Sequence, residues 1–194
     1  MAIFPRIFKV ARLIRSRAAV VRWRLTLGSN SIPWDLSVAS GVTLIATDGA
    51  SVSFGKRCSI DSKATLIAKF GSISVGAGGH IGIGCVIVAR ESIQIGMNVL
   101  IAEYVTLRDQ DHLFDGSGIT SKSGFSTAPI VIGNNVWLGA KVTVTKGVSI
   151  GDNTVVGANS VVTRDIPSNC VAVGAPAQVI RNLALVSKTK GTLG

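Results

Sequence analysis

The clearest pattern in the chain is an aliphatic residue at every sixth position between Ile132 and Pro167. This stretch divides without remainder into the hexads IGNNVW, LGAKVT, VTKGVS, IGDNTV, VGANSV and VTRDIP. Gly or Thr follows the first residue of each hexad, and Val, Thr, Ser or Ile stands at the fifth position. A period of six fits neither an α-helix nor the simple alternation of a strand. It indicates an internal repeat in which each hexad supplies one short strand and one bend.

Short strands joined by bends predict a parallel β-helix. The first residue of each hexad would point inward and stack on its equivalent in the next coil. Gly and Asn suit the bends because they tolerate positive φ, and the repeat places Gly133, Asn134, Gly151, Asn153 and Asn159 there. With three hexads per coil, the sequence predicts an all-β fold shaped as a triangular prism.

The same period continues upstream if interruptions are allowed. First positions then fall at Phe54, Ile60, Leu66, Val75, Ile81, Ile87, Ile95, Ile101 and Leu107. Coils begin at 54, 75, 95, 132 and 150, at intervals of 21, 20, 37 and 18 residues, so every insertion falls at one corner of the prism. The longest insertion holds most of the segment from Asp111 to Pro129. The register between 75 and 93 stays open, because Ile83 and Ile93 fit an alternative frame.

The termini predict two additions to the solenoid. Apolar residues recur near helical spacing from Pro5 to about Leu27, with arginines between them, which predicts a basic amphipathic helix. The segment from Ala177 to Val186 favours a short C-terminal helix that closes the other end. The expected organisation is therefore the N-terminal helix in 1–30, a β-helix domain in 31–176 with the inserted loop 111–129, and a C-terminal helix and tail in 177–194.

The positive charge is concentrated at the N-terminus. The formal net charge is +10. The first 34 residues contain no acid and hold seven basic residues, Arg6, Lys9, Arg12, Arg15, Arg17, Arg22 and Arg24. The remainder carries only +3, so nucleic acid is not an expected partner. The helix has two interpretations, a cap on the solenoid or on a neighbouring subunit, and a peripheral anchor that lays residues 1–27 on the cytoplasmic face of the inner membrane.

Cysteine usage and hydropathy predict a reduced, cytoplasmic protein. The three cysteines, Cys58, Cys85 and Cys170, are widely spaced and form no CxxC pair, so we expect neither disulfides nor a structural zinc. No uncharged apolar run of 18 residues occurs, and no signal-peptide core is evident.

The two histidines differ in their position relative to the repeat. His80, in GAGGHIGIG, lies inside a coil, where we interpret it as an ordinary outward residue. His112, in RDQDHLFDG, lies where the repeat stops and the long insertion begins. Loops held by a rigid scaffold are where catalytic groups concentrate, so His112 is the candidate functional residue; an ordinary loop histidine is the alternative.

Three segments resemble the left-handed β-helix, hexapeptide-repeat acyltransferases, in particular the branch of galactoside, maltose and polysaccharide O-acetyltransferases. They are IQIGMNVLIAEYVTLRDQDH, PIVIGNNVWLGAKVTVTKGVSIGDNTVVGANSVVTRDIP and GAPAQVIR, and the likeness covers about residues 70–181. The resemblance implies a left-handed coil, a homotrimer, and acetyl-CoA bound in clefts between adjacent prisms. Each active site would then lie at a subunit interface.

The resemblance also implies roles for individual residues. His112 matches the catalytic base, and Asp109 and Asp111 are candidates to orient its ring; a solvated acidic loop is the alternative for the two carboxylates. Trp137 matches a tryptophan beside the pantetheine and acceptor region, or it packs at the subunit seam. The further residues matched to acetyl-CoA contacts are Gly139 and Ala140 near the thioester, with Ala158, Thr163, Arg164 and Arg181 along the coenzyme. Gln178 departs from the family pattern, which has Arg or Lys there.

The expected function is acetyl-CoA-dependent O-acetylation of a sugar in a bacterial polysaccharide or lipopolysaccharide, by direct transfer without a metal. N-acetylation of an amino or nucleotide sugar is the alternative, and a non-catalytic β-helix scaffold is the second. A carbonic anhydrase of the same fold needs three zinc-binding histidines, and the chain has two. No Asn precedes His112 by one coil, where Gly84 or Cys85 stands, so the acceptor sugar stays unspecified.

Overall fold

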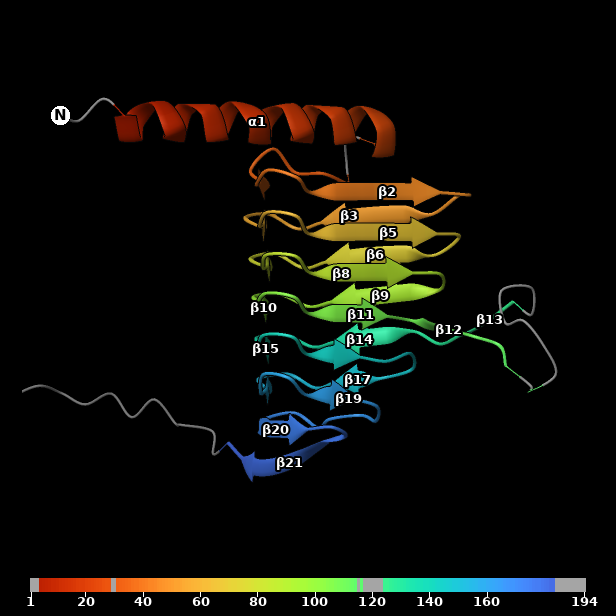
Figure 1. Ribbon diagram of the computed structural model, residues 1–194. Helices are drawn as coiled ribbons and strands as arrows, with labels where there is room; N and C mark the ends of the chain where they lie inside the picture. Colours follow the sequence, from red (N-terminus) through yellow and green to blue (C-terminus); the bar gives the residue numbers. More distant parts are fainter. Residues whose placement is uncertain (1–3, 29–30, 115, 117–123, 184–194) are drawn as a thin grey trace, which may run out of the picture.

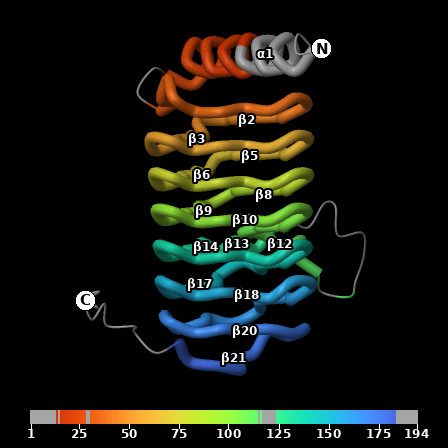
Figure 2. Tube along the Cα trace, turned by 90° about the vertical axis from the view of Figure 1, so that its left-hand side faces the viewer, coloured from red at the N-terminus to blue at the C-terminus, as the bar shows by residue number. Residues whose placement is uncertain are grey.

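The protein is a prism of stacked β coils with one helix lying across its first coil (Figure 1). The computed structural model describes residues 4–28, 31–114, 116 and 124–183, and within the helix it places the side chains of Ile14 and of residues 16–28. Successive coils lie parallel and directly above one another (Figure 2). The predicted parallel β-helix is confirmed; its left-handed sense stays a prediction.

Three sheets form the three faces of the prism, and the chain visits them in the order A, B, C. Face A contains β1 (Ser37–Val38), β4 (Ser59–Ile60), β7 (His80–Ile81), β10 (Leu100–Ile101), β15 (Trp137–Leu138), β18 (Val155–Val156), β20 (Cys170–Gly174) and β21 (Ala177–Asn182). Face B contains β2 (Thr43–Thr47), β5 (Thr65–Lys69), β8 (Val86–Ala89), β11 (Thr106–Arg108), β16 (Thr143–Val144) and β19 (Val161–Val162). Face C contains β3 (Ser51–Phe54), β6 (Ser72–Val75), β9 (Ser92–Ile95), β14 (Ile130–Ile132) and β17 (Ser149–Ile150).

The core is the column of hexad first positions. Every first position predicted from Phe54 to Val162 is buried, and equivalent residues pair in register, as Leu66 does with Ile87. The alternative frame is wrong at Ile83, which is 44% exposed. Ile93 is buried as well, because the strand β9 has four residues and turns two of them inward.

The extra residues of the upstream coils lie at the corner between faces B and C. They lengthen the strands there, so that β5 has five residues whereas β16 has two. The longest insertion leaves this corner as an antiparallel pair, β12 (Gln110–His112) and β13 (Phe125–Thr127). In Figure 1 the pair projects from the prism. The corner therefore presents a hairpin on an otherwise regular scaffold.

The N-terminal helix α1 (Phe4–Leu27) covers the first coil. One face of the helix, with Val20 and Trp23, is buried. The Ser16 Oγ accepts a hydrogen bond of 2.9 Å from the Val38 backbone N–H, which would otherwise lie on an open sheet edge. The capping interpretation is thus confirmed for this chain's own solenoid. Among the described residues, no helix combines the length and apolar character that crossing a bilayer requires.

The predicted C-terminal helix is wrong where the structure describes it. Residues Ala177–Asn182 form β21, which pairs antiparallel with β20. The chain reverses at Gly174, whose φ is +106°, and Pro176 follows. The strand satisfies backbone groups at the last edge of face A, which a short helix would leave open. The rest of the predicted helix, from 184 onward, lies outside the described residues.

Candidate active site

The hairpin β12–β13 holds His112 at the B–C corner. His112 pairs in register with Phe125, and their ring centroids lie 4.3 Å apart with the planes tilted by 40°. The next residue, Leu113, donates its N–H to the Gly124 carbonyl at 3.1 Å. His112 is nevertheless exposed. The imidazole is therefore oriented by its neighbours and open to a reactant.

Phe125 and Arg90 extend this stack, and the sequence did not reveal either of them. The Arg90 guanidinium carbon lies 3.5 Å from the Phe125 ring centroid, a distance typical of a cation–π contact. Phe125 is thus contacted by both Arg90 and His112. The register could have placed Arg90 at this corner, but nothing in the insertion marked Phe125 as the aromatic residue that would return to it.

Asp109 has a structural role, which corrects its assignment as a catalytic residue. The side chain is fully buried. Its carboxylate accepts hydrogen bonds from the backbone N–H of Arg90, at 2.8 and 3.1 Å, and of Glu91, at 2.8 Å. Its carbonyl accepts the N–H of Ala128 at 3.0 Å. Asp109 therefore ties the preceding coil and the returning end of the insertion to one point.

We predict that Asp109→Ala lowers the free energy of unfolding by about 3 kcal/mol, because buried N–H groups lose charge-assisted partners. Asp109→Asn keeps an acceptor oxygen and should cost about 1 kcal/mol. Asp165→Ala is the matched control, since Asp165 also accepts a corner N–H, from Ser149 at 2.8 Å, but is exposed. Urea denaturation measures all three, and equal losses for Asp109→Ala and Asp165→Ala would contradict the assignment.

Asp111 lies apart from the His112 ring. Its Oδ2 is 3.5 Å from the Lys146 Nζ, and its side chain is 62% exposed. Strand alternation sends the two neighbouring side chains to opposite sides of β12. The structure records Phe125, and no carboxylate, as the partner of the His112 ring among the described residues.

Four of the residues matched to acetyl-CoA contacts, Trp137, Gly139, Ala140 and Ala158, lie on face A and at the A–B corner. Trp137 is 48% exposed on β15. Ala140 and Ala158 occupy equivalent positions one coil apart, since Ala140 accepts the N–H of Asn159 through its carbonyl at 2.8 Å. Gly139 is needed for close coil packing, because a Cβ there would approach the Ala158 nitrogen to 2.6 Å.

The Gly139 N–H is not free to stabilise an oxyanion. That N–H donates to the Val156 carbonyl at 2.8 Å and forms part of the ladder between coils. Among the described residues, the N–H of Ala140 donates to no backbone carbonyl. Ala140 is thus the better placed of the two for an oxyanion.

The remaining predicted residues are exposed and lie in two places. Thr163 and Arg164 follow β19 at the B–C corner, and Arg181 lies on β21. The ten predicted residues therefore do not converge within one chain. In Figure 1 the strand β15 lies at the left edge of the prism and the hairpin β12–β13 projects from the right.

His80 belongs to a cluster that the sequence interpretation missed. Its Nδ1 lies 2.8 Å from the Ser59 Oγ, and its Nε2 lies 3.5 Å from the Asp61 Oδ2. Ser59 and His80 pair in register across face A. A hollow of about 410 Å³ beside them reaches Tyr104 and Trp137.

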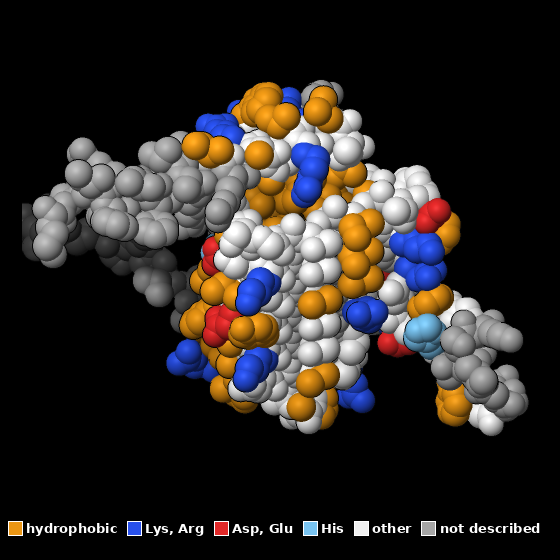
Figure 3. All heavy atoms as spheres, turned by 45° about the horizontal axis from the view of Figure 1, so that its top comes forward, with side chains coloured by type: hydrophobic (Ala, Val, Ile, Leu, Met, Phe, Trp, Pro, Cys, Tyr) orange, Lys and Arg blue, Asp and Glu red, His pale blue; other side chains and the backbone are white. Residues whose placement is uncertain are grey.

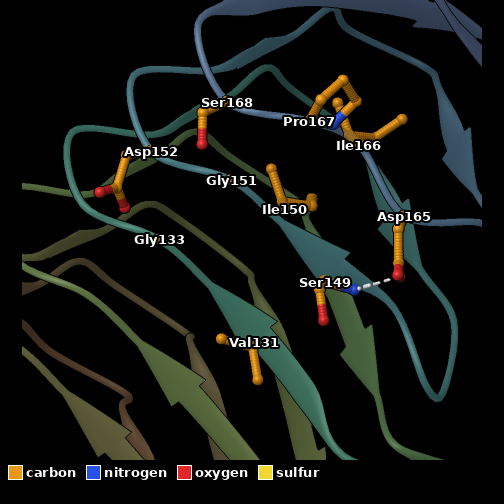
Figure 4. A pocket seen from close by; sticks show the side chains of 10 residues that line it. All are labelled: Val131, Gly133, Ser149, Ile150, Gly151, Asp152, Asp165, Ile166, Pro167 and Ser168. Carbon is orange, nitrogen blue, oxygen red and sulfur yellow. Dashed lines mark hydrogen bonds between the residues drawn. The ribbon is translucent and has the colours of Figure 1, made fainter.

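A second hollow, of about 570 Å³, lies on face C (Figure 4). Its carboxylates serve the solenoid itself. Asp165 accepts from Ser149, and the Asp152 Oδ1 accepts from the Asn134 N–H at 2.6 Å. This hollow offers no free catalytic group comparable to His112.

The cysteine thiols are poor candidates for an acyl-enzyme nucleophile. Cys58, Cys85 and Cys170 are buried and unpaired. Burial raises the pKa of the Cys85 thiol to about 11 and also raises the pKa of Cys58, which disfavours the reactive thiolate at neutral pH. In the described part of the chain, no three His, Cys, Asp or Glu side chains are grouped to hold a metal ion.

The hexad repeat matches that of known proteins. The family described as "Bacterial transferase hexapeptide (six repeats)" matches residues 129–164, which contain β14 to β19. A galactoside O-acetyltransferase of Escherichia coli (strain K12) is 44% identical over 112 residues, which are 58% of this chain and 55% of that protein. The chain is thus similar to the hexapeptide-repeat transferases.

Two further sugar O-acetyltransferases are similar to this chain. A putative lipopolysaccharide biosynthesis O-acetyl transferase, WbbJ of E. coli K12, is 42% identical over 103 residues, which are 49% of this chain and 53% of that protein. The chain spans about half the length of these curated relatives. The solved maltose O-acetyltransferase of Clostridium difficile 630 has a TM-score of 0.53 and 25% identity, over 89% of this chain and 88% of its own.

Proposed function

We propose that this hexapeptide-repeat protein transfers an acetyl group from acetyl-CoA to a hydroxyl of a sugar in a bacterial polysaccharide or lipopolysaccharide. The observation that carries the proposal is His112, an exposed imidazole held by Phe125 on a hairpin at the prism corner. The names of the galactoside and lipopolysaccharide relatives support a sugar acceptor.

His112 supplies the base that acetyl transfer to a sugar hydroxyl requires. A sugar hydroxyl is a weak nucleophile, and imidazole is the side chain that enzymes use most often to accept such a proton. As the oxygen attacks the thioester carbonyl, its proton moves to His112. The new C–O bond forms and the C–S bond breaks, and the imidazolium then gives the proton to the leaving sulfur. Transfer is direct, in agreement with the buried thiols.

The donor site is proposed to form between two copies of the chain in a homotrimer. His112 lies at the B–C corner, whereas Trp137 and Ala140 lie on and beside face A, so a neighbouring copy must supply one of the two groups. The Ala140 N–H would face the developing oxyanion. The exposed guanidinium groups of Arg164 and Arg181 would bind the phosphates of the coenzyme.

A screen of thiol release from acetyl-CoA tests the proposal. The full chain is incubated with activated sugars and purified glycans one at a time, with acceptor-free protein as the blank. We expect release above the blank for at least one glycan. A base-labile acetyl product supports O-acetylation. A base-stable product indicates the alternative, which is N-acetylation of an amino or nucleotide sugar. No release with any acceptor, by a protein that binds acetyl-CoA, would contradict transferase activity and favour the scaffold alternative.

Helix α1 is also proposed to rest on the cytoplasmic face of the inner membrane. The face opposite Val20 and Trp23 exposes Ile14 (63%), Val21 (43%) and Leu25 (83%). Figure 3 shows apolar and basic side chains together on the outer surface of the helix. Such a surface suits the boundary of anionic lipid, while the buried face keeps the helix docked on the solenoid.

We predict that the full chain floats with anionic vesicles at low salt and that Ile14→Glu with Leu25→Glu lowers the bound fraction at least about tenfold. Point variants are preferable to deletion of the helix, which would uncover the first coil. Met97→Glu is the control, because Met97 is 53% exposed at the C–A corner of the prism. Equal flotation of the double variant, or no flotation of the unaltered chain, would contradict membrane binding.

A further inference from the structure

The hollow of about 410 Å³ is a concave site on face A and the A–B corner. The strands β4, β7, β10 and β15 are consecutive in the sheet, and His80, Leu100 and Trp137 pair in register across it. Two aromatic side chains, Tyr104 and Trp137, line the hollow, and both are about half exposed. Its surface is thus mainly apolar and aromatic.

Tyr104 occupies an unusual backbone position for an aromatic residue. Its φ is +58°, a region that disfavours bulky side chains and that clusters at functional sites. The equivalent corner positions of neighbouring coils hold Gly84, Lys141 and Asn159. Its ring lies against Gly84, where an added Cβ would come within 2.6 Å of the ring. The corner is therefore shaped to hold this ring flat beside the hollow.

The polar groups of the hollow are hydrogen-bond acceptors and a histidine. Asp61 and Glu103 line it together with His80, and no lysine or arginine is among the lining residues. Both ring nitrogens of His80 are satisfied if Nε2–H points to Asp61 and Nδ1 accepts a hydrogen bond from the Ser59 hydroxyl. Carboxylates without a basic residue suit a neutral ligand with many hydroxyl groups and disfavour a phosphate.

We infer that this hollow binds a pyranose ring of the acceptor glycan. The apolar face of the ring would lie on Tyr104 and Trp137, and its hydroxyl groups would donate to Asp61 and Glu103. Its identification as the acceptor rests on the proposed transferase function. Placement supports it, because the Glu103 carbonyl accepts the Lys141 N–H at 2.9 Å, so the hollow adjoins the corner turn with Ala140. A sugar there would meet the acetyl group at Ala140.

Saturation-transfer NMR tests the inference with the full chain and no acetyl-CoA. The probes are methyl β-galactopyranoside, methyl α-glucopyranoside and methyl N-acetyl-β-glucosaminide. We expect transfer to at least one probe, and an increase of about tenfold in its Kd in Tyr104→Asn, which removes the ring and tolerates positive φ. Phe70→Asn is the matched control, because Phe70 is also exposed and has a φ of +67° at another corner. Its Kd should match that of the unaltered chain.

Asp61→Asn gives a second test that leaves the backbone turn unaltered, and it should weaken the same probe. No saturation transfer to any probe, or equal affinity in Tyr104→Asn and Asp61→Asn, would overturn the site. Displacement of the probe by pantetheine would also overturn it, since the hollow would then hold the donor. Binding of the probe without any acetyl transfer would refute the proposed transferase function but not the sugar site. Acetyl transfer with an unchanged acceptor KM in Tyr104→Asn would refute the hollow as the acceptor site but not the transferase function.

Discussion

His112→Ala should lower the rate of acetyl transfer by roughly 10²–10⁴-fold, because the imidazole acts as a base in the transition state. The Kd for acetyl-CoA should change little, since His112 is not among the residues assigned to the coenzyme. The fold should also persist, because His112 is exposed and, in the described part of the chain, its ring packs against Phe125 alone among aromatic side chains. Steady-state kinetics and calorimetry of acetyl-CoA binding measure both quantities.

Imidazole added to the buffer provides a chemical control. It should restore part of the activity of His112→Ala, because a free base can enter the space that the side chain leaves. A fully active alanine variant would remove His112 from the mechanism. A variant that has lost acetyl-CoA binding as well would show that the hairpin holds the coenzyme instead.

Mixing two inactive variants should restore activity if the site lies between copies of the chain. His112→Ala retains Trp137, and Trp137→Ala retains His112, so a mixed trimer contains some interfaces with both groups intact. Random assembly should give about a quarter of the unaltered activity. The two variants are unfolded and refolded together, with each refolded alone as the control.

The outcome of mixing distinguishes the two possible site geometries. Activity no higher than that of either variant alone would mean that one chain supplies both groups, or that the chains do not associate. Sedimentation of the refolded mixture separates these cases. A trimer without restored activity would contradict the shared site.

The core was predictable because the six-residue period recurs in the sequence of each coil. An aliphatic residue at each sixth position fixes which side chains turn inward, so Ile81 and Leu107 could be placed without the structure. The break in the repeat likewise located His112. The C-terminal strand was not predictable in this way, because Ala177–Asn182 owes its conformation to the open edge of β20 and not to its own pattern.

Contacts between coils explain most of what the sequence missed. Asp109 resembled a catalytic carboxylate next to His112, but its partners, Arg90 and Glu91, lie on the preceding coil. His80 resembled an ordinary outward residue, yet the register brings Ser59 and Asp61 to its two ring nitrogens. Spacing along the chain showed that such residues share a corner or a face, but hydrogen-bond partners depend on side-chain geometry.

The identity of the product tests most directly whether the protein transfers an acetyl group to a sugar hydroxyl. The full chain is incubated with acetyl-CoA labelled with ¹³C at the carbonyl and with a glycan that stimulates thiol release, and the reaction is followed by NMR. We expect a labelled acetyl ester on the sugar, formed with one free thiol per ester and removed by mild base. This ester should be absent with His112→Ala. A labelled amide, or an ester that forms equally well with His112→Ala, would contradict this expectation.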